Sequence, residues 1–252
     1  MTHVLITRPL TASQQLAGQL DDLGLNPIVM PFYTFTARDP GFDLDSHWSN
    51  KNRKLVVFTS PRAVEYGLPH IAPETIEKLE IAVVGAATRR ALEKGGRQVH
   101  IQASSGYTSE DLLQLPELAA QPGEAVIYCA PGGRETIAEG LSALGWSVAK
   151  AMVYERVSLS PSQAQLDELE SATELISVWT SVAAIDLAHQ SLPAILWGKI
   201  LTSPTLMISA RIREHFQQLG ATRTELTEGP GNPDILQTII DLISEQTGSI
   251  KH

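Results

Sequence analysis

Short runs of apolar and β-branched residues alternate along the chain with segments of helical periodicity. The run His3–Thr7 precedes a segment of helical spacing from about Ala12 to Leu23, and Gly24 follows as a stop signal. Other strand-like runs lead into helical segments in the same way: Leu55–Thr59, Ile81–Gly85, Ala125–Cys129, Leu175–Thr180 and Leu206–Ser209. Strands that alternate with helices predict an α/β fold, with parallel sheets that carry helices on both faces.

The second half of the chain repeats the pattern of the first at an offset of 121 residues. This offset places Gly24 on Gly145, Tyr33 on Tyr154 and the segment 58–60 on the segment 179–181. Two α/β units can align by chance, but here Gly, Tyr and the Thr-Ser pair match as well as the apolar positions, which favours a duplication. We therefore expect two similar α/β units, each with an extended segment at an equivalent place, Pro31–Phe35 and Met152–Val157.

Composition narrows the classes of function. The net charge of −9 argues against a nucleic-acid surface, which requires a basic patch. The N-terminal residues do not form a basic segment followed by a long apolar one, and the longest apolar runs are too short to cross a bilayer, so we expect a cytoplasmic protein without membrane contact. The single cysteine, Cys129, allows neither an internal disulfide nor a cysteine metal site, and a buried strand position is expected for it.

Polar residues follow several predicted strands at the point where a helix begins. Thr7 and Arg8, Ser60 and Arg62, Thr88, and Thr180 with Ser181 are all placed in this way. The carboxyl ends of parallel strands meet at one edge of a sheet, where helix N-termini present free N–H groups that suit carboxylates or phosphates. Ser60 and Ser181 are also expected to cap their helices, and capping alone is the simpler explanation of each serine.

The arginines Arg8, Arg62, Arg134 and Arg211 could bind anions or lie solvated on the surface. Gly133 and Arg134 follow the strand Ala125–Cys129, where glycine permits close approach of a ligand. The sequence has no Walker A segment, no G-x-G-x-x-G and no G-x-S-x-G, and its histidines are scattered, so we expect neither a metal nor a cofactor. Tyr154 could donate a hydrogen bond or act as a weak general acid, or it could simply pack as Tyr33 could.

Taken in order, these segments resemble the uroporphyrinogen-III synthase family along nearly the whole chain. The residues that carry the resemblance are Val4–Pro9, Phe58–Val64, Val83–Thr88, Gly106–Leu112, Gly132–Glu135, Val153–Arg156 and Ser209–Arg211. The resemblance implies a first, discontinuous domain of residues 1–36 and 157–252, a second domain of residues 37–156, and a two-stranded linker around 31–36 and 152–157.

The resemblance also implies a reaction, that of a cyclising hydro-lyase. Hydroxymethylbilane, a linear tetrapyrrole with acetate and propionate groups, would lose water and close with its terminal ring inverted to give uroporphyrinogen III, a step of tetrapyrrole and heme biosynthesis. Without guidance the same substrate closes uninverted, so the protein would chiefly control geometry. Residues that match family positions lining the cleft would bind carboxylates: Thr7, Arg8, Ser60, Arg62, Thr88, Gly133, Arg134, Thr180, Ser181 and Ser209. Tyr154 matches a tyrosine suspected of assisting departure of the hydroxyl.

Two other classes of protein remain open from the residues themselves. A two-lobed protein that binds an anion without reacting it would use the same strand-end serines and arginines. A nucleotide-dependent enzyme is disfavoured because the phosphate loop is missing. Nothing in the sequence demands an oligomer, so a monomer is expected, with a transient contact to the preceding pathway enzyme left open.

Overall fold

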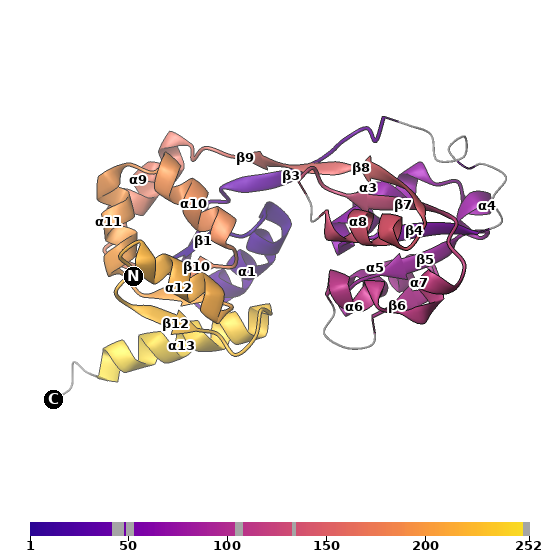
Figure 1. Ribbon diagram of the computed structural model, residues 1–252. Coiled ribbons are helices and arrows are strands. Elements are labelled where there is room, and N and C mark those ends of the chain that lie inside the picture. The colour runs from indigo at the N-terminus through magenta and orange to yellow at the C-terminus, as the bar shows by residue number, and fades with distance from the viewer. Residues whose placement is uncertain (42–47, 49–52, 104–107, 133–134, 249–252) are drawn as a thin grey trace. The chain divides into compact units, whose positions relative to one another are not determined.

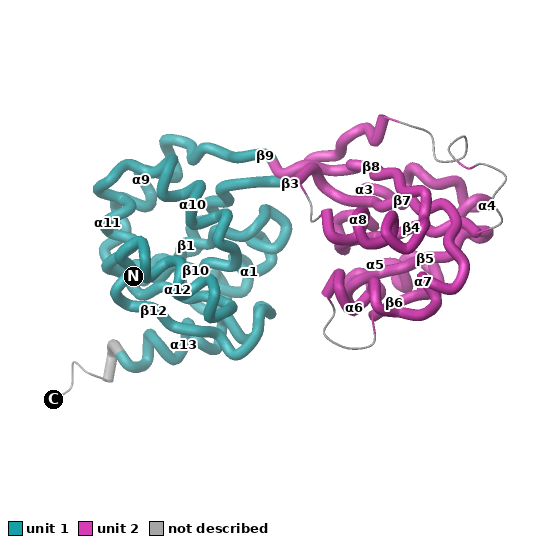
Figure 2. The backbone as a smooth tube through the Cα atoms, viewed as in Figure 1, with its two compact units in different colours: residues 1–34, 157–252 teal, residues 35–156 magenta. Residues whose placement is uncertain are grey.

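The computed structural model describes residues 1–41, 48, 53–103, 108–132 and 135–248, and Figure 1 labels their helices and strands. The chain divides into two compact units (Figure 2). Unit 1 comprises Met1–Thr34 and Val157–His252, and unit 2 comprises Phe35–Arg156. Each unit contains its own five-stranded sheet. Among the described helices, none has both the length and the apolar character needed to cross a membrane.

Unit 1 is built on a parallel sheet in the order β12-β11-β10-β1-β2. Its strands are β1 (Thr2–Ile6), β2 (Asn26–Val29), β10 (Glu174–Trp179), β11 (Thr205–Met207) and β12 (Thr224–Leu226). Its helices are α1 (Leu10–Asp22), α9 (Gln163–Ser171), α10 (Val182–Ser191), α11 (Ala194–Thr202), α12 (Ala210–Gln218) and α13 (Asn232–Gly248).

Side chains of the unit 1 strands alternate between two cores because successive residues of a strand point to opposite faces. Ile176 and Val178 pack in a cluster with Leu16 of α1 and Ile239 of α13. Trp179, the next residue along β10, instead contacts the rings of Trp197 and Phe216 from α11 and α12. Both faces of the sheet are therefore covered by helices.

Unit 2 has a parallel sheet in the order β6-β5-β4-β7-β8. Its strands are β4 (Lys54–Phe58), β5 (Glu80–Val83), β6 (Ile101–Gln102), β7 (Glu124–Cys129) and β8 (Ser147–Met152). The helices are α3 (Pro61–Gly67), the 3₁₀ turn η1 (Leu68–His70), α4 (Pro73–Ile76), α5 (Ala86–Lys94), α6 (Ser109–Leu113), α7 (Pro116–Ala120) and α8 (Thr136–Ala143).

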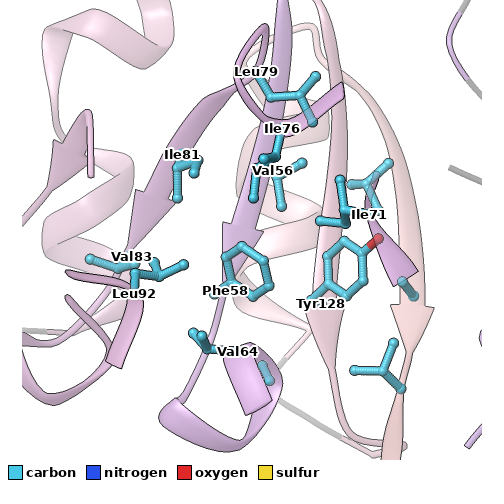
Figure 3. Packing of buried hydrophobic residues seen from close by; sticks show 14 of the residues in the cluster. Val56, Phe58, Val64, Ile71, Ile76, Leu79, Ile81, Val83, Leu92 and Tyr128 are labelled. Carbon is cyan, nitrogen blue, oxygen red and sulfur yellow. The ribbon is translucent and has the colours of Figure 1, made fainter. Parts of the chain in front are cut away.

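The unit 2 sheet also separates two apolar clusters. On one face Val56 and Phe58 pack with Val64 and Leu92 of α3 and α5, and Figure 3 shows the ring of Phe58 among these residues. On the other face Leu55, Val57 and Ile127 pack with side chains of α6, α7 and α8. The predicted α/β fold with two parallel sheets flanked by helices is thus confirmed.

The two sheets have the same strand order when equivalent strands of the repeat are matched. β10 corresponds to β4, β1 to β7, β2 to β8, β11 to β5 and β12 to β6. A separate two-stranded sheet pairs β3 (Tyr33–Ala37) with β9 (Tyr154–Ser158), and these are the two places at which the chain passes from one unit to the other. Each unit therefore combines strands from both halves of the repeat.

Candidate functional site

In unit 2, the carboxyl end of β4 places Ser60 against Tyr154. Ser60 lies at the N-cap of α3, where its hydroxyl accepts a hydrogen bond from the Ala63 amide at 3.0 Å. The same Oγ lies 3.0 Å from the hydroxyl of Tyr154, a residue that is 8% exposed and whose ring stacks on Tyr66. The two hydroxyls share one hydrogen bond between them, so the pair keeps a second hydrogen to donate to a ligand.

A cavity of about 500 Å³ opens beside this pair, within unit 2. Its lining comes from the ends of β4, β5, β7 and β8 and from the starts of α6 and α8. The lining residues are Thr59, Ser60, Val84, Thr108, Ser109, Ile127, Cys129, Ala130, Gly132, Glu135, Ile137, Ala138, Lys150, Met152 and Tyr154. A mixed lining of apolar side chains and a few convergent polar groups is typical of a small-molecule site.

The described charged residues of this cavity are Lys150 and Glu135. The Lys150 ammonium donates to both carboxylate oxygens of Glu135, at 2.8 and 2.7 Å. This hydrogen bond raises the pKa of Lys150 above its ordinary value. A substrate carboxylate that reached Lys150 would have to compete with Glu135, because both bind the same cation.

The thiol of Cys129 lines the same cavity but is 7% exposed. Burial raises the pKa of the thiol, and the nearby charge of Lys150 offsets part of this effect. The thiol consequently stays protonated near neutral pH, as a structural rather than a nucleophilic cysteine would.

We expect Cys129 to react more slowly with iodoacetamide at pH 8 in the native protein than in the protein unfolded in guanidinium chloride, because the thiolate is the reacting species. Mass spectrometry of the alkylated chain measures the alkylation of Cys129 alone, since the chain has one cysteine. Equal rates in the two states would contradict a buried, protonated thiol.

Unit 1 contains an arrangement of the same kind. Ser181 lies at the N-cap of α10 and accepts a hydrogen bond from the Ala184 amide at 3.2 Å. Its Oγ lies 3.2 Å from the hydroxyl of Tyr33, a residue that is 7% exposed. The predicted capping roles of Ser60 and Ser181 are confirmed, and each serine also contacts a tyrosine.

Arg8 follows the neighbouring strand β1 in unit 1. Its guanidinium donates to the side-chain oxygen of Asn232 at 2.6 Å, and partial burial lowers its pKa. Within the described part of the chain, Arg8 has no carboxylate within ion-pair distance. A hydrogen bond to a neutral amide offsets only part of the desolvation cost of a half-buried cation. A carboxylate that bound beside this guanidinium would offset more of that cost.

Threonines end the central strands of both sheets. The hydroxyl of Thr7 donates to the Val178 carbonyl at 2.7 Å, and that of Thr59 donates to the Tyr128 carbonyl at 3.0 Å. Thr7 is 1% exposed. Each carbonyl also accepts the backbone N–H of the same threonine, so both donors of the residue bind the penultimate carbonyl of the neighbouring strand.

The other predicted residues lie in different settings. Arg62 pairs with Glu65 on its own helix and stacks over the ring of Phe35. Thr88 is buried in α5, and Ser209 is the N-cap residue of α12 without a side-chain cap bond. Thr180 and Arg211 lie near the same edge of unit 1, after β10 and early in α12. Gly133 and Arg134 lie outside the described residues.

Five polar residues of the cavity were not among the predicted site residues: Thr59, Thr108, Ser109, Glu135 and Lys150. Thr108 begins α6 with a capping box to Asp111, a signal that the sequence shows plainly. Lys150 lies on β8, whose weakly apolar sequence does not predict a strand. Among the described residues, no group of three or more histidine, cysteine, aspartate or glutamate side chains could hold a metal ion.

The fold and the site together define a class: two-unit α/β proteins of repeated strand order, with a small-molecule cavity at the strand ends of unit 2. Residues 14–235 match the model of the family described as uroporphyrinogen-III synthase HemD. Because this match covers most of the chain, the protein belongs to the uroporphyrinogen-III synthase family.

Individual relatives agree with the family match. The chain is similar to the uroporphyrinogen-III synthase of Escherichia coli K12, with 25% identity over 248 residues that cover 94% of this chain and 99% of the relative. Two solved structures share the fold at 15% identity. The uroporphyrinogen-III synthetase of Helicobacter pylori 26695 has a TM-score of 0.66 over 96% of this chain and 100% of its own. A mutant uroporphyrinogen III synthase from the extremely thermophilic bacterium Thermus thermophilus has a TM-score of 0.62 over 97% of this chain and 100% of its own.

Proposed function

We propose that this protein cyclises hydroxymethylbilane, with loss of water and inversion of the terminal ring, to give uroporphyrinogen III. The observation that carries the proposal is the family match over residues 14–235. The rival, an anion-binding protein without catalysis, has no specific observation in its favour. The enzyme is a cyclising lyase of tetrapyrrole biosynthesis.

The chemistry of the described site supports a protein that acts mainly by positioning. Among the described residues of the unit 2 cavity, the groups that can exchange protons are few, and Glu135 and Lys150 already bind each other. Hydroxyls and strand-end amides are better suited to hold carboxylates than to perform strong acid or base catalysis. Holding a flexible tetrapyrrole in one geometry removes the entropic disadvantage of closing through the substituted carbon.

In this proposal the carboxylates of the substrate bind at the strand ends of both units. The residues assigned to binding are Thr7, Arg8, Ser60, Arg62, Thr88, Gly133, Arg134, Thr180, Ser181 and Ser209. Tyr154 donates a hydrogen bond to the departing hydroxyl of the bilane. Tyr154 and Ser60 both line the unit 2 cavity, and their hydroxyls contact each other. These two observations support the assignment.

The chain is proposed to act as a cytoplasmic monomer that needs no metal or cofactor. Residues 1–36 and 157–252 would form one domain, residues 37–156 the other, with linkers around 31–36 and 152–157. The two compact units of the structure separate after Thr34 and after Arg156, which supports these boundaries. Sedimentation equilibrium that gave the mass of a dimer at assay concentrations would reject the monomer.

We expect Arg8→Gln to raise the KM for hydroxymethylbilane by about tenfold, because a hydrogen-bonded charge pair with a substrate carboxylate is lost. The melting temperature should change little, since the neutral side chain relieves the burial of a charge that has no ionic partner among the described residues. Arg89→Gln, which removes a cation from the exposed pair with Glu93, is the matched control and should keep the KM of the wild type. An unchanged KM for Arg8→Gln would remove this arginine from the substrate site.

The proposed function is tested by supplying freshly prepared hydroxymethylbilane and analysing the porphyrin isomers after oxidation. The proposal predicts mainly isomer III with the protein and isomer I in the enzyme-free control. Isomer I in both samples would reject the proposed synthase activity, and a protein that binds anions without catalysis would then be the alternative.

A further inference from the structure

Tyr154 is held by three neighbouring side chains of unit 2. Its hydroxyl lies 3.0 Å from the Oγ of Ser60. The ring of Tyr66 stacks on the Tyr154 ring, with the two centroids 5.7 Å apart and an angle of 19° between the planes. The ring of Phe35 meets Tyr154 in a T-shaped contact, also at 5.7 Å. Because these are favourable geometries for aromatic pairs, the ring of Tyr154 is held as well as its hydroxyl.

Helix α3 supplies two of these three contacts. Ser60 is its N-cap residue, and Tyr66 lies in its last turn. The hydroxyl of Tyr66 donates to the Phe35 carbonyl at 3.0 Å, which ties this end of α3 to β3. β3 in turn pairs with β9, the strand that begins at Tyr154. The helix that holds the hydroxyl of Tyr154 therefore also holds its ring.

The repeat keeps the hydroxyl pair in both units but not these two aromatic residues. Unit 1 has its own pair of tyrosine and serine hydroxyls. At the offset of 121 residues, however, Leu187 takes the place of Tyr66, and Arg156 takes the place of Phe35. The unit 1 tyrosine is 7% exposed and Tyr154 is 8% exposed, so burial of the tyrosine does not depend on aromatic residues at these two places. The two aromatic neighbours are specific to Tyr154.

We propose that Tyr66 is a positioning residue for the proposed reaction, which fixes the ring of Tyr154 and thereby the place of the hydroxyl that meets the bilane. This inference rests on the proposed function and deepens it. Tyr154 lines the unit 2 cavity and Tyr66 is not among the described lining residues, so Tyr66 acts through Tyr154. A proton donor must lie within hydrogen-bond reach of the leaving group, and a displacement of about 1 Å can cost about 100-fold in rate.

The test is a double-mutant cycle in kcat between Tyr66→Leu and Tyr154→Phe, with hydroxymethylbilane as the substrate. Tyr66→Leu introduces the residue of the equivalent unit 1 position. It should lower kcat about tenfold and keep KM within about twofold of the wild type, because a loosened ring misplaces its hydroxyl. In the Tyr154→Phe background the same change should alter kcat by less than about twofold, since no hydroxyl remains to be placed. Tyr66→Phe, which keeps the stacked ring, should keep kcat within about threefold of the wild type.

Two further variants separate positioning from folding. Leu68→Ala truncates another partly buried residue of the same apolar cluster, so it should lower the melting temperature while keeping the wild-type kcat. Phe35→Leu removes the T-shaped contact and leaves the sequence of α3 unchanged. It should lower kcat in the same way, and this loss should also disappear in the Tyr154→Phe background. If Tyr66→Leu does not fold, the cycle with Phe35→Leu decides the question.

The outcomes distinguish the positioning role from the proposed function. Equal losses of kcat from Tyr66→Leu in the two backgrounds would indicate a general structural effect and overturn the positioning role. A wild type that makes isomer III, together with a Tyr66→Leu variant of unchanged kcat, would also overturn it while the proposed function stands. Failure of the wild type to make isomer III would overturn the proposed function itself.

Discussion

Tyr154→Phe is expected to lower kcat by about 100-fold or more, the usual contribution of a positioned proton donor to a rate. The variant keeps the ring, which packs against Tyr66 and Phe35, and removes only the hydroxyl that faces Ser60. If that hydroxyl assists the departure of water from the bilane, its loss acts in the transition state and should leave KM nearly unchanged. Stopped-flow measurement of bilane consumption, with isomer analysis of the products, gives both constants.

Ser60→Ala is the informative control for this variant, because it breaks the same Tyr154–Ser60 hydrogen bond from the other side. It also removes the cap of α3 and should lower the melting temperature. Its effect on kcat should be less than about tenfold, since substrate binding is shared among many groups and one hydrogen bond is worth about 1 kcal/mol. A larger loss of turnover with Ser60→Ala than with Tyr154→Phe would reject the role given to Tyr154.

Trp179→Ala is expected to destabilise unit 1 by about 3–5 kcal/mol, the range for truncating a buried aromatic side chain. Trp179 is fully buried and its ring contacts Phe32, Trp197 and Phe216. A loss of this size is a large part of the stability of an ordinary domain. Hydrogen exchange followed by mass spectrometry should show lost protection in β10 and little change in β4, which belongs to unit 2.

The repeat supplies the matched variant, since Phe58 occupies the place of Trp179 in unit 2. Trp179→Phe should cost less, about 1–3 kcal/mol, and part of that cost comes from the buried Ser177 hydroxyl that loses its bond to the indole N–H. Adding Ser177→Ala should therefore restore some stability. Equal losses of protection in β4 and β10 would contradict the assignment of this core to unit 1 alone.

The architecture could be predicted because its signals are local and repeated. Strong β-branched runs such as Leu55–Thr59 marked the inner strands, and Gly24, which adopts a φ of 72°, marked the end of α1. The edge strands were harder to find, since β8 is half exposed and carries Lys150 in the middle of a weakly apolar sequence. Edge strands need less apolar sequence because one side faces solvent.

The candidate site could be predicted only in part. Capping signals identified Ser60 and Ser181, because N-caps depend on residues next to them in sequence. The contacts of these serines with Tyr154 and Tyr33 join residues 94 and 148 positions apart, and no local pattern encodes such a distance. The match of tyrosines in the repeat was visible, but the exchange of partners between the halves appeared only in the fold.

The central claim, that the protein directs how the bilane closes, is tested most directly by the isomer fraction as a function of enzyme concentration. Uncatalysed closure to isomer I competes with the enzyme for a fixed amount of hydroxymethylbilane. The account predicts that the fraction of isomer III rises with enzyme concentration and approaches completeness. A fraction of isomer III that stays at the enzyme-free value across the titration would contradict it.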